Sequence, residues 1–65
     1  MKFALVEDLY NKNKVWIIKK YKSGNIYYNQ QIEGKTIYCF TRTTKKFLKS
    51  MFKTNEKALA VVNNF

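Results

Sequence analysis

Hydrophobic and polar positions alternate through residues 14–42 in three runs rich in Val, Ile, Tyr and Phe. Such alternation is typical of strands with one buried face. Ser23-Gly24 and Glu33-Gly34 separate the runs. A dipeptide ending in Gly between two runs of this kind indicates a hairpin, because Gly tolerates the positive φ of a tight turn. We therefore predict a three-stranded antiparallel meander.

A further strand is predicted near the beginning of the chain. Residues 2–7 (KFALVE) alternate, with Phe and Leu on one side and Ala and Val on the other. Residues 8–13 then collect Asn and Asp, which favour loops. We expect this loop to join two antiparallel neighbours.

The pattern changes to a helical period after Arg42. Apolar residues at 47, 48, 51 and 52, interleaved with lysines, predict an amphipathic basic helix that Thr43 or Thr44 can cap. Thr54 or Asn55 can cap again, so we expect one helix with a break near Thr54, or two helices.

An alternative for the same segment makes residues 46–52 a strand, followed by a single helix that begins at Asn55. In both versions the fold class is α+β. We predict one domain over residues 1–65, an antiparallel three- to four-stranded β-meander with the C-terminal helix packed on one face.

Register decides which side chains share a face of the meander. Two-residue turns would pair Tyr21 with Ile26, and Tyr27 with Phe40. One face would then be apolar, with Val15, Ile17, Tyr21, Ile26, Tyr28, Ile32, Ile37 and Cys39. The other would be aromatic with a basic rim, with Trp16, Ile18, Tyr27, Tyr38, Phe40, Lys14, Lys20, Lys22 and Arg42. Sliding either turn by one residue would exchange the faces of a whole strand.

Charge adds a functional indication. The chain carries 13 Lys and Arg against 4 Asp and Glu, a formal net charge of +9 in 65 residues. Such an excess is offset most easily by an anionic partner. Aromatic rings can stack on bases while Lys and Arg neutralise phosphates. We therefore predict binding of nucleic acid, DNA or RNA, through Lys14, Trp16, Lys20, Lys22, Tyr27, Tyr38, Phe40, Arg42, Lys45, Lys46 and Lys49. A competing interpretation buries the aromatic face as the core beneath the C-terminal helix.

Catalysis is not predicted. The chain has no His, which is both the commonest general base and a common metal ligand. Neither Gly lies in a phosphate-binding loop motif, and we expect no metal and no cofactor. Cys39 is the only Cys and is predicted to be a buried small hydrophobe.

The lone Cys favours a reducing, cytoplasmic setting. No stretch has the 18 or so apolar residues of a membrane span, so no membrane partner is expected.

A protein partner is the alternative to nucleic acid. The same positive charge, with an exposed apolar patch left over, suggests an inhibitor or modulator of an acidic host protein. The Lys- and Asn-rich, His-free composition resembles that of phage early proteins. A homodimer is also possible, because a chain this short buries little surface alone. Residues 51–62 (MFKTNEKALAVV) resemble the closing strand and helix of the hybrid-binding domain of some ribonucleases H, but the preceding meander does not follow that family.

Overall fold

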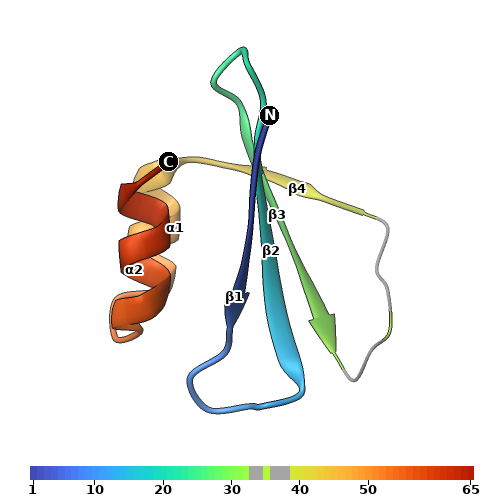
Figure 1. Ribbon diagram of the computed structural model, residues 1–65, viewed down its shortest axis with the longest axis vertical. Helices are drawn as coiled ribbons and strands as arrows, with labels where there is room; N and C mark the ends of the chain where they lie inside the picture. Colours follow the sequence, from blue (N-terminus) through green and yellow to red (C-terminus); the bar gives the residue numbers. More distant parts are fainter. Residues whose placement is uncertain (33–34, 36–38) are drawn as a thin grey trace.

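A four-stranded antiparallel sheet is followed by two helices in the computed structural model, which describes residues 1–32, 35 and 39–65 (Figure 1). The elements are β1 (Lys2–Glu7), β2 (Lys14–Lys20), β3 (Ile26–Ile32), β4 (Thr41–Thr43), α1 (Lys45–Met51) and α2 (Glu56–Asn63). The strands lie in the order β1-β2-β3-β4. The predicted α+β meander is confirmed.

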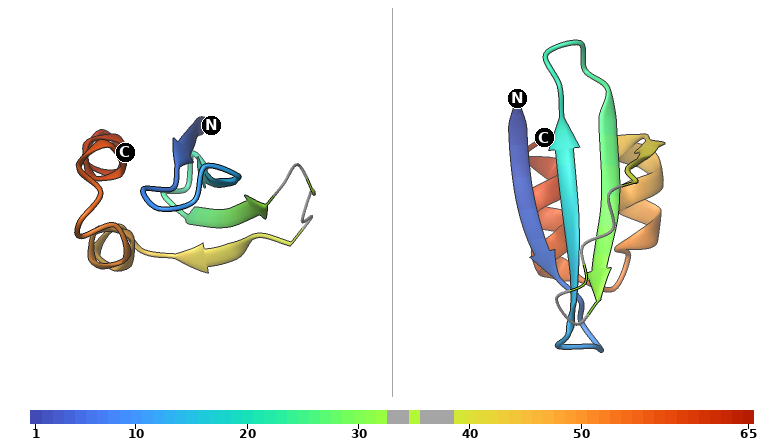
Figure 2. Two further views of the ribbon diagram at one scale, coloured as in Figure 1. Left: turned by 90° about the horizontal axis from the view of Figure 1, so that it is seen from below. Right: turned by 90° about the vertical axis from the view of Figure 1, so that its right-hand side faces the viewer.

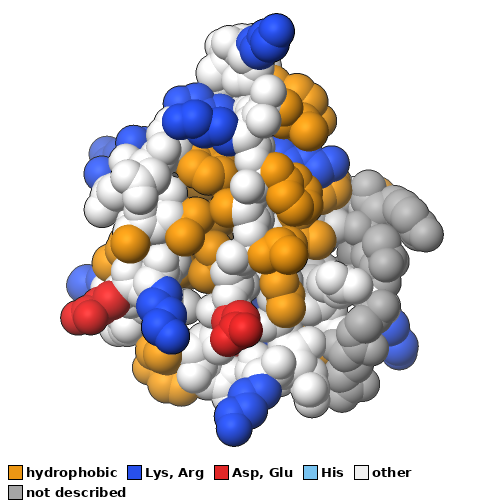
Figure 3. Space-filling view, in the orientation of Figure 1, with side chains coloured by type: hydrophobic (Ala, Val, Ile, Leu, Met, Phe, Trp, Pro, Cys, Tyr) orange, Lys and Arg blue, Asp and Glu red, His pale blue; other side chains and the backbone are white. Residues whose placement is uncertain are grey.

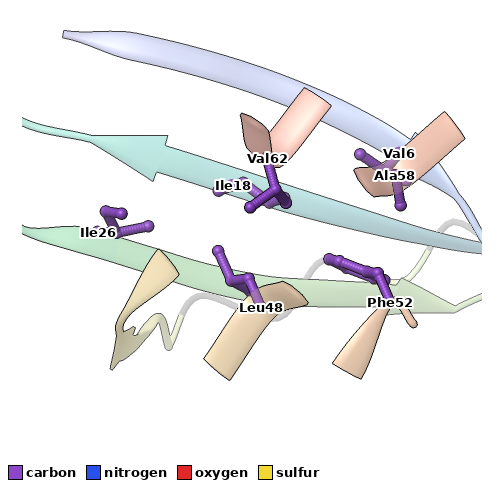
Figure 4. Packing of buried hydrophobic residues seen from close by; sticks show 7 residues of the cluster. All are labelled: Val6, Ile18, Ile26, Leu48, Phe52, Ala58 and Val62. Atoms are coloured by element: carbon purple, nitrogen blue, oxygen red, sulfur yellow. The ribbon is translucent and has the colours of Figure 1, made fainter. Parts of the chain in front are cut away.

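Both helices lie on the same side of the sheet, which we call the covered face; the opposite side, which neither helix covers, is called the open face (Figure 2). The core lies between the helices and the covered face (Figure 4). Its buried residues are Val6, Ile18, Ile26, Leu48, Phe52, Ala58 and Val62. None of the described helices is long and apolar enough to cross a membrane.

The prediction of two helices is confirmed, and the alternative strand over residues 46–52 is wrong. Thr44 is the N-cap of α1, and its hydroxyl accepts a hydrogen bond from the Phe47 N–H at 3.1 Å. Leu48 lies in α1 and Phe52 is its C-cap, and the two side chains, one helical turn apart, both reach the core. The same helix replaces the strand implied by the resemblance to ribonucleases H.

Asn55 joins the second helix to the sheet. Its Oδ1 accepts a hydrogen bond from the Ala58 N–H at 3.1 Å and so caps α2. Its Nδ2 donates to the Glu7 carbonyl oxygen at 3.1 Å. Because Asn55 is buried, both bonds are made away from water and hold the start of α2 against the end of β1.

The turn between β2 and β3 contains three residues, not the two that we predicted. The Tyr21 N–H donates to the Asn25 carbonyl at 3.0 Å, and the Gly24 N–H donates to the Tyr21 carbonyl at 2.9 Å. Gly24 has φ of 92°, as expected for the left-handed residue that ends a three-residue hairpin loop. Lys20, and not Tyr21, therefore pairs with Ile26.

This one-residue shift corrects the predicted faces. Trp16 and Ile18 share the covered face with Ile26 and Tyr28, while Tyr27 lies on the open face. The Trp16 ring lies 5.6 Å from that of Phe52 in an edge-on arrangement. Trp16 thus belongs to the margin of the core, as the competing interpretation of the aromatic face required.

The pairing of the last strand also differs from the predicted one. Tyr27 pairs with Arg42 and not with Phe40. Cys39 is exposed, so the prediction that it is a buried hydrophobe is wrong. The predicted turn at Glu33-Gly34 and the predicted positions of Ile37 and Tyr38 lie outside the described residues.

Asp8 organises the loop between β1 and β2. Its carboxylate accepts hydrogen bonds from the N–H groups of Tyr10 (3.1 Å) and Asn11 (2.9 Å) and from the indole N–H of Trp16 (3.3 Å). Desolvation raises the pKa of Asp8, but the bonds from Trp16, Tyr10 and Asn11, with the charge of Lys14, outweigh it and lower the pKa below its usual value.

Replacing Gly24 with Ala is predicted to destabilise the fold by about 1–2 kcal/mol, the usual cost of a left-handed conformation for a residue with a Cβ. No atom lies within 4 Å of the added Cβ, so the cost comes from the backbone alone. Urea unfolding measures it. An unchanged midpoint and slope would contradict the observed turn.

The Asp8→Asn variant tests the carboxylate. Because the folded pKa lies below the unfolded value of about 3.9, the ionised group stabilises the fold above about pH 4 and loses this effect as pH falls through the folded pKa. The difference in melting temperature between the two proteins should therefore shrink as the pH is lowered from about 7 to about 3. A difference independent of pH would contradict the pKa direction.

Candidate nucleic-acid interface

Four residues form a row across the open face, one from each strand. Phe3 pairs with Lys19, Lys19 with Tyr27, and Tyr27 with Arg42. Directly opposed residues of antiparallel strands share a face, with Cβ atoms about 4.5–5.5 Å apart. Aromatic and cationic side chains thus alternate across the sheet, and we call this set the cross-strand row.

Further aromatic rings surround the row. Tyr21 packs edge-on against Tyr27, with ring centroids 5.5 Å apart, and remains 43% exposed. The ammonium group of Lys19 lies 3.8 Å from the centroid of the Phe40 ring. Arg42, the last member of the row, is exposed, and its guanidinium donates a hydrogen bond to Asn25 Oδ1 at 3.0 Å, which orients the Arg42 side chain.

A basic cleft of about 400 Å³ adjoins the row at the end of the β2–β3 hairpin. Lys20, Arg42 and Lys45 supply its charge, and among the residues that the structure describes no carboxylate lines it. The other described residues that line it are Gly24, Asn25, Ile26, Thr43 and Thr44. Arg42 lies in the row on the open face and also lines the cleft, whereas Lys20 shares the covered face with Ile26, so Arg42 links two cationic features on different sides of the sheet.

Two of the cleft lysines also hold the end of α2. Lys45 Nζ donates to the Asn63 carbonyl at 3.3 Å, and Lys20 Nζ donates to the Phe65 carbonyl. Lys2 Nζ adds a bond to the Asn64 carbonyl at 3.2 Å. Cations are favoured at a helix C-terminus, where carbonyl groups lack partners and the helix dipole is negative. These lysines therefore concentrate positive charge at one end of the molecule.

The structure brings together only part of the predicted site. Tyr27, Phe40 and Arg42 lie on or beside the open face. The cleft contains Lys20 and Lys45, and Lys22 lies in the adjoining loop. Lys46 and Lys49 are exposed on α1, further along the chain.

Three predicted residues are not placed in this surface. Trp16 lies on the covered face, and Lys14 Nζ lies 4.5 Å from its ring centroid at the other end of β2. Their assignment to one face with Tyr27 is wrong, because the turn has a third residue. Tyr38 lies outside the described residues.

Sequence reasoning missed Phe3, Lys19 and Tyr21. Lys19 in β2 and Tyr21 just after it alternate with Lys20, so the predicted register placed them on the face of Ile26 and not on that of Tyr27. The signal that could have found them is Gly24 as the third residue of the loop, a position at which Gly is common in three-residue hairpins. Phe3 lay in a predicted strand, but nothing in the sequence specified its neighbour.

A cavity of about 510 Å³ lies at the opposite end of the molecule. Glu7, Asp8 and Glu56 line it together with Lys12 and Lys57. In the described part of the chain no group of three or more His, Cys, Asp or Glu residues is arranged to hold a metal ion.

Fold and surface together define a small basic α+β domain with an aromatic and cationic sheet face. No family model, no curated protein and no solved structure matches this chain. The described surface is therefore the basis for a functional proposal.

Proposed function

We propose that this chain is a non-catalytic nucleic-acid-binding protein whose binding surface is the cross-strand row with the adjoining basic cleft. The single observation that carries the proposal is the row itself, in which Tyr27 lies between Lys19 and Arg42. An aromatic ring flanked by cations matches an unpaired nucleotide, which offers a base to stack and a phosphate to neutralise.

Single strands suit this surface better than a duplex. The bases of a single strand are free to reach Tyr27 and Phe3, whereas the bases of a duplex are already stacked on each other. Two further cations of the cleft, Lys20 and Lys45, lie beyond Arg42, so the backbone of a bound strand can pass from the row at Arg42 into the cleft. Recognition of this kind tolerates many sequences, because every base has a face for stacking.

The cationic part is tested by a double variant, Lys19→Ala with Arg42→Ala, against the matched double variant Lys12→Ala with Lys57→Ala at the opposite cavity. Both lower the net charge equally. Binding of a labelled single-stranded oligonucleotide is measured by fluorescence anisotropy over a salt series. For the first variant we expect weaker binding and a salt slope shallower by about 0.7 per lost phosphate contact. The second should resemble the wild type, and equal losses would contradict the location.

The aromatic part is tested by Tyr27→Ala against Tyr10→Ala, since Tyr10 is 84% exposed in the β1–β2 loop. Loss of one stacked base should weaken binding by about 1–3 kcal/mol in the first variant. The salt slope should not change, because no phosphate contact is lost. The control should bind like the wild type.

An acidic protein remains the alternative partner, since it would also be attracted by Lys19, Arg42 and the cleft. Competition with a polyanion that has no bases, such as polyglutamate, distinguishes an acidic protein partner from nucleic acid. If polyglutamate displaces the oligonucleotide at equal charge concentration, and Tyr27→Ala leaves binding unchanged, the surface recognises charge alone and the nucleic-acid proposal fails.

A further inference from the structure

The two edges of the sheet, β1 and β4, differ in length and in apolar character. β1 is the end strand of the sheet and is six residues long. On its open-face side Phe3 is 54% and Leu5 is 62% exposed. At the other edge of the sheet, β4 has three residues, all polar (TRT). Long apolar edge strands attract further strands, whereas short polar ones do not.

Apolar side chains flank this edge on both sides. In Figure 1 β1 lies nearest to the viewer, and Figure 3 shows hydrophobic side chains on either side of the band of backbone in the same position. A shallow cavity of about 290 Å³ between β1 and α2 is lined by Leu5, Val6 and Val61, among others. A strand added at this edge would therefore bury apolar surface as well as pair backbone groups.

Backbone alternation specifies which groups of β1 are available. The Asp8 N–H donates to the Lys14 carbonyl at 3.1 Å, so the even-numbered residues of β1 face β2 in the hydrogen-bonded positions. The backbone groups of Phe3, Leu5 and Glu7 consequently point away from β2. The contact of Glu7 is consistent with this direction, because its carbonyl oxygen accepts a hydrogen bond from Asn55 Nδ2 and not from β2. Phe3 and Leu5 thus direct two N–H and two C=O groups toward the free edge.

The distribution of charge indicates which strand would pair with the outer edge of β1. The three described carboxylates, Glu7, Asp8 and Glu56, all line the cavity beyond the C-terminal end of β1. Lys2 and Lys20 pair at the N-terminal end of β1, next to the basic cleft. An antiparallel copy of the same strand would set the basic end of each molecule beside the acidic end of the other.

We propose that two copies of this chain associate through antiparallel pairing of their β1 strands, with Ala4 of each copy at the two-fold axis. Phe3 of one copy then faces Leu5 of the other, so all the outward backbone groups of these residues are paired. The bond between Asn55 and Glu7 stays intact. The two sheets join into one of eight strands, four from each copy.

Other registers pair these groups less completely. Centring the pair on Leu5 would set Phe3 against Glu7, whose carbonyl already accepts the bond from Asn55. A slip by one residue would bring the covered face of one copy beside the open face of the other, because side chains alternate along a strand. The register centred on Ala4 avoids both.

Sedimentation equilibrium over a wide concentration range, on protein freed of nucleic acid by nuclease and high salt, tests the dimer. The expected mass is 15.6 kDa, twice the 7.8 kDa of one chain. Leu5→Lys should abolish the dimer, since it places a cation against Phe3 of the second copy. Leu9→Lys is the matched control, because Leu9 is an exposed leucine in the β1–β2 loop. A monomer at every concentration, or a dimer that survives Leu5→Lys, overturns the proposal.

Cross-linking tests the register. In the Cys39→Ser background, Ala4→Cys should give a disulfide-linked dimer on oxidation, because Cα atoms of such a pair lie about 4.5 Å apart, within disulfide range. Lys2→Cys in the same background is the control and should not cross-link, since its counterpart lies several residues away along the strand. Cross-linking at residue 2 but not at residue 4 overturns the register. Neither experiment uses nucleic acid, so their outcomes are independent of the proposed function.

Discussion

The positive φ of Gly24 closes a three-residue loop, and this loop fixes the register of β2 against β3. Ile18 and Ile26 consequently lie on one face and enter the core, where Leu48 and Val62 from the two helices meet them. Lys19 and Tyr27 are paired on the other face for the same reason. A slip by one residue would bury Lys19 without a counter-charge and expose Ile18, and each change is unfavourable. The packing of the core therefore also fixes which residues are paired on the candidate binding surface.

Two sets of polar contacts position α2 against the sheet. They lie at opposite ends of the helix, one among acidic residues and the other among basic residues. Asn55 ties the start of α2 to the end of β1, where Glu7 and Glu56 lie. Lys20 and Lys45 bind the carbonyl groups at the other end of α2. The helix dipole favours this distribution, because acidic groups lie near its N-terminus and basic groups near its C-terminus. The same separation of charge supports both proposals, nucleic acid at the basic end and antiparallel association along β1.

Local signals in the sequence predicted the strands and helix caps, whereas register depended on contacts distant in sequence. Thr44 and Asn55 were recognisable as caps because their side chains bond to backbone three residues ahead. In β2, KVWIIKK is apolar at both odd and even positions, so the hydrophobic pattern did not determine which face is buried. A loop of two or three residues ending at Gly24 fits the sequence equally well. Trp16 was therefore assigned to the binding face and Lys19 was missed, and of the residues predicted for that face Tyr27 and Arg42 are paired on the open face.

Mapping the bound oligonucleotide on the protein by heteronuclear NMR is the most direct test of the central claim, that the open face at the basic end is the binding surface. Titration with a short single strand is predicted to shift the amide signals of Lys19, Tyr27 and Arg42 and the ring signals of Tyr21, with small changes at Trp16 and in the loop at Asp8. Shifts concentrated at Trp16 and Lys14, or the absence of any shift at low salt, would contradict it.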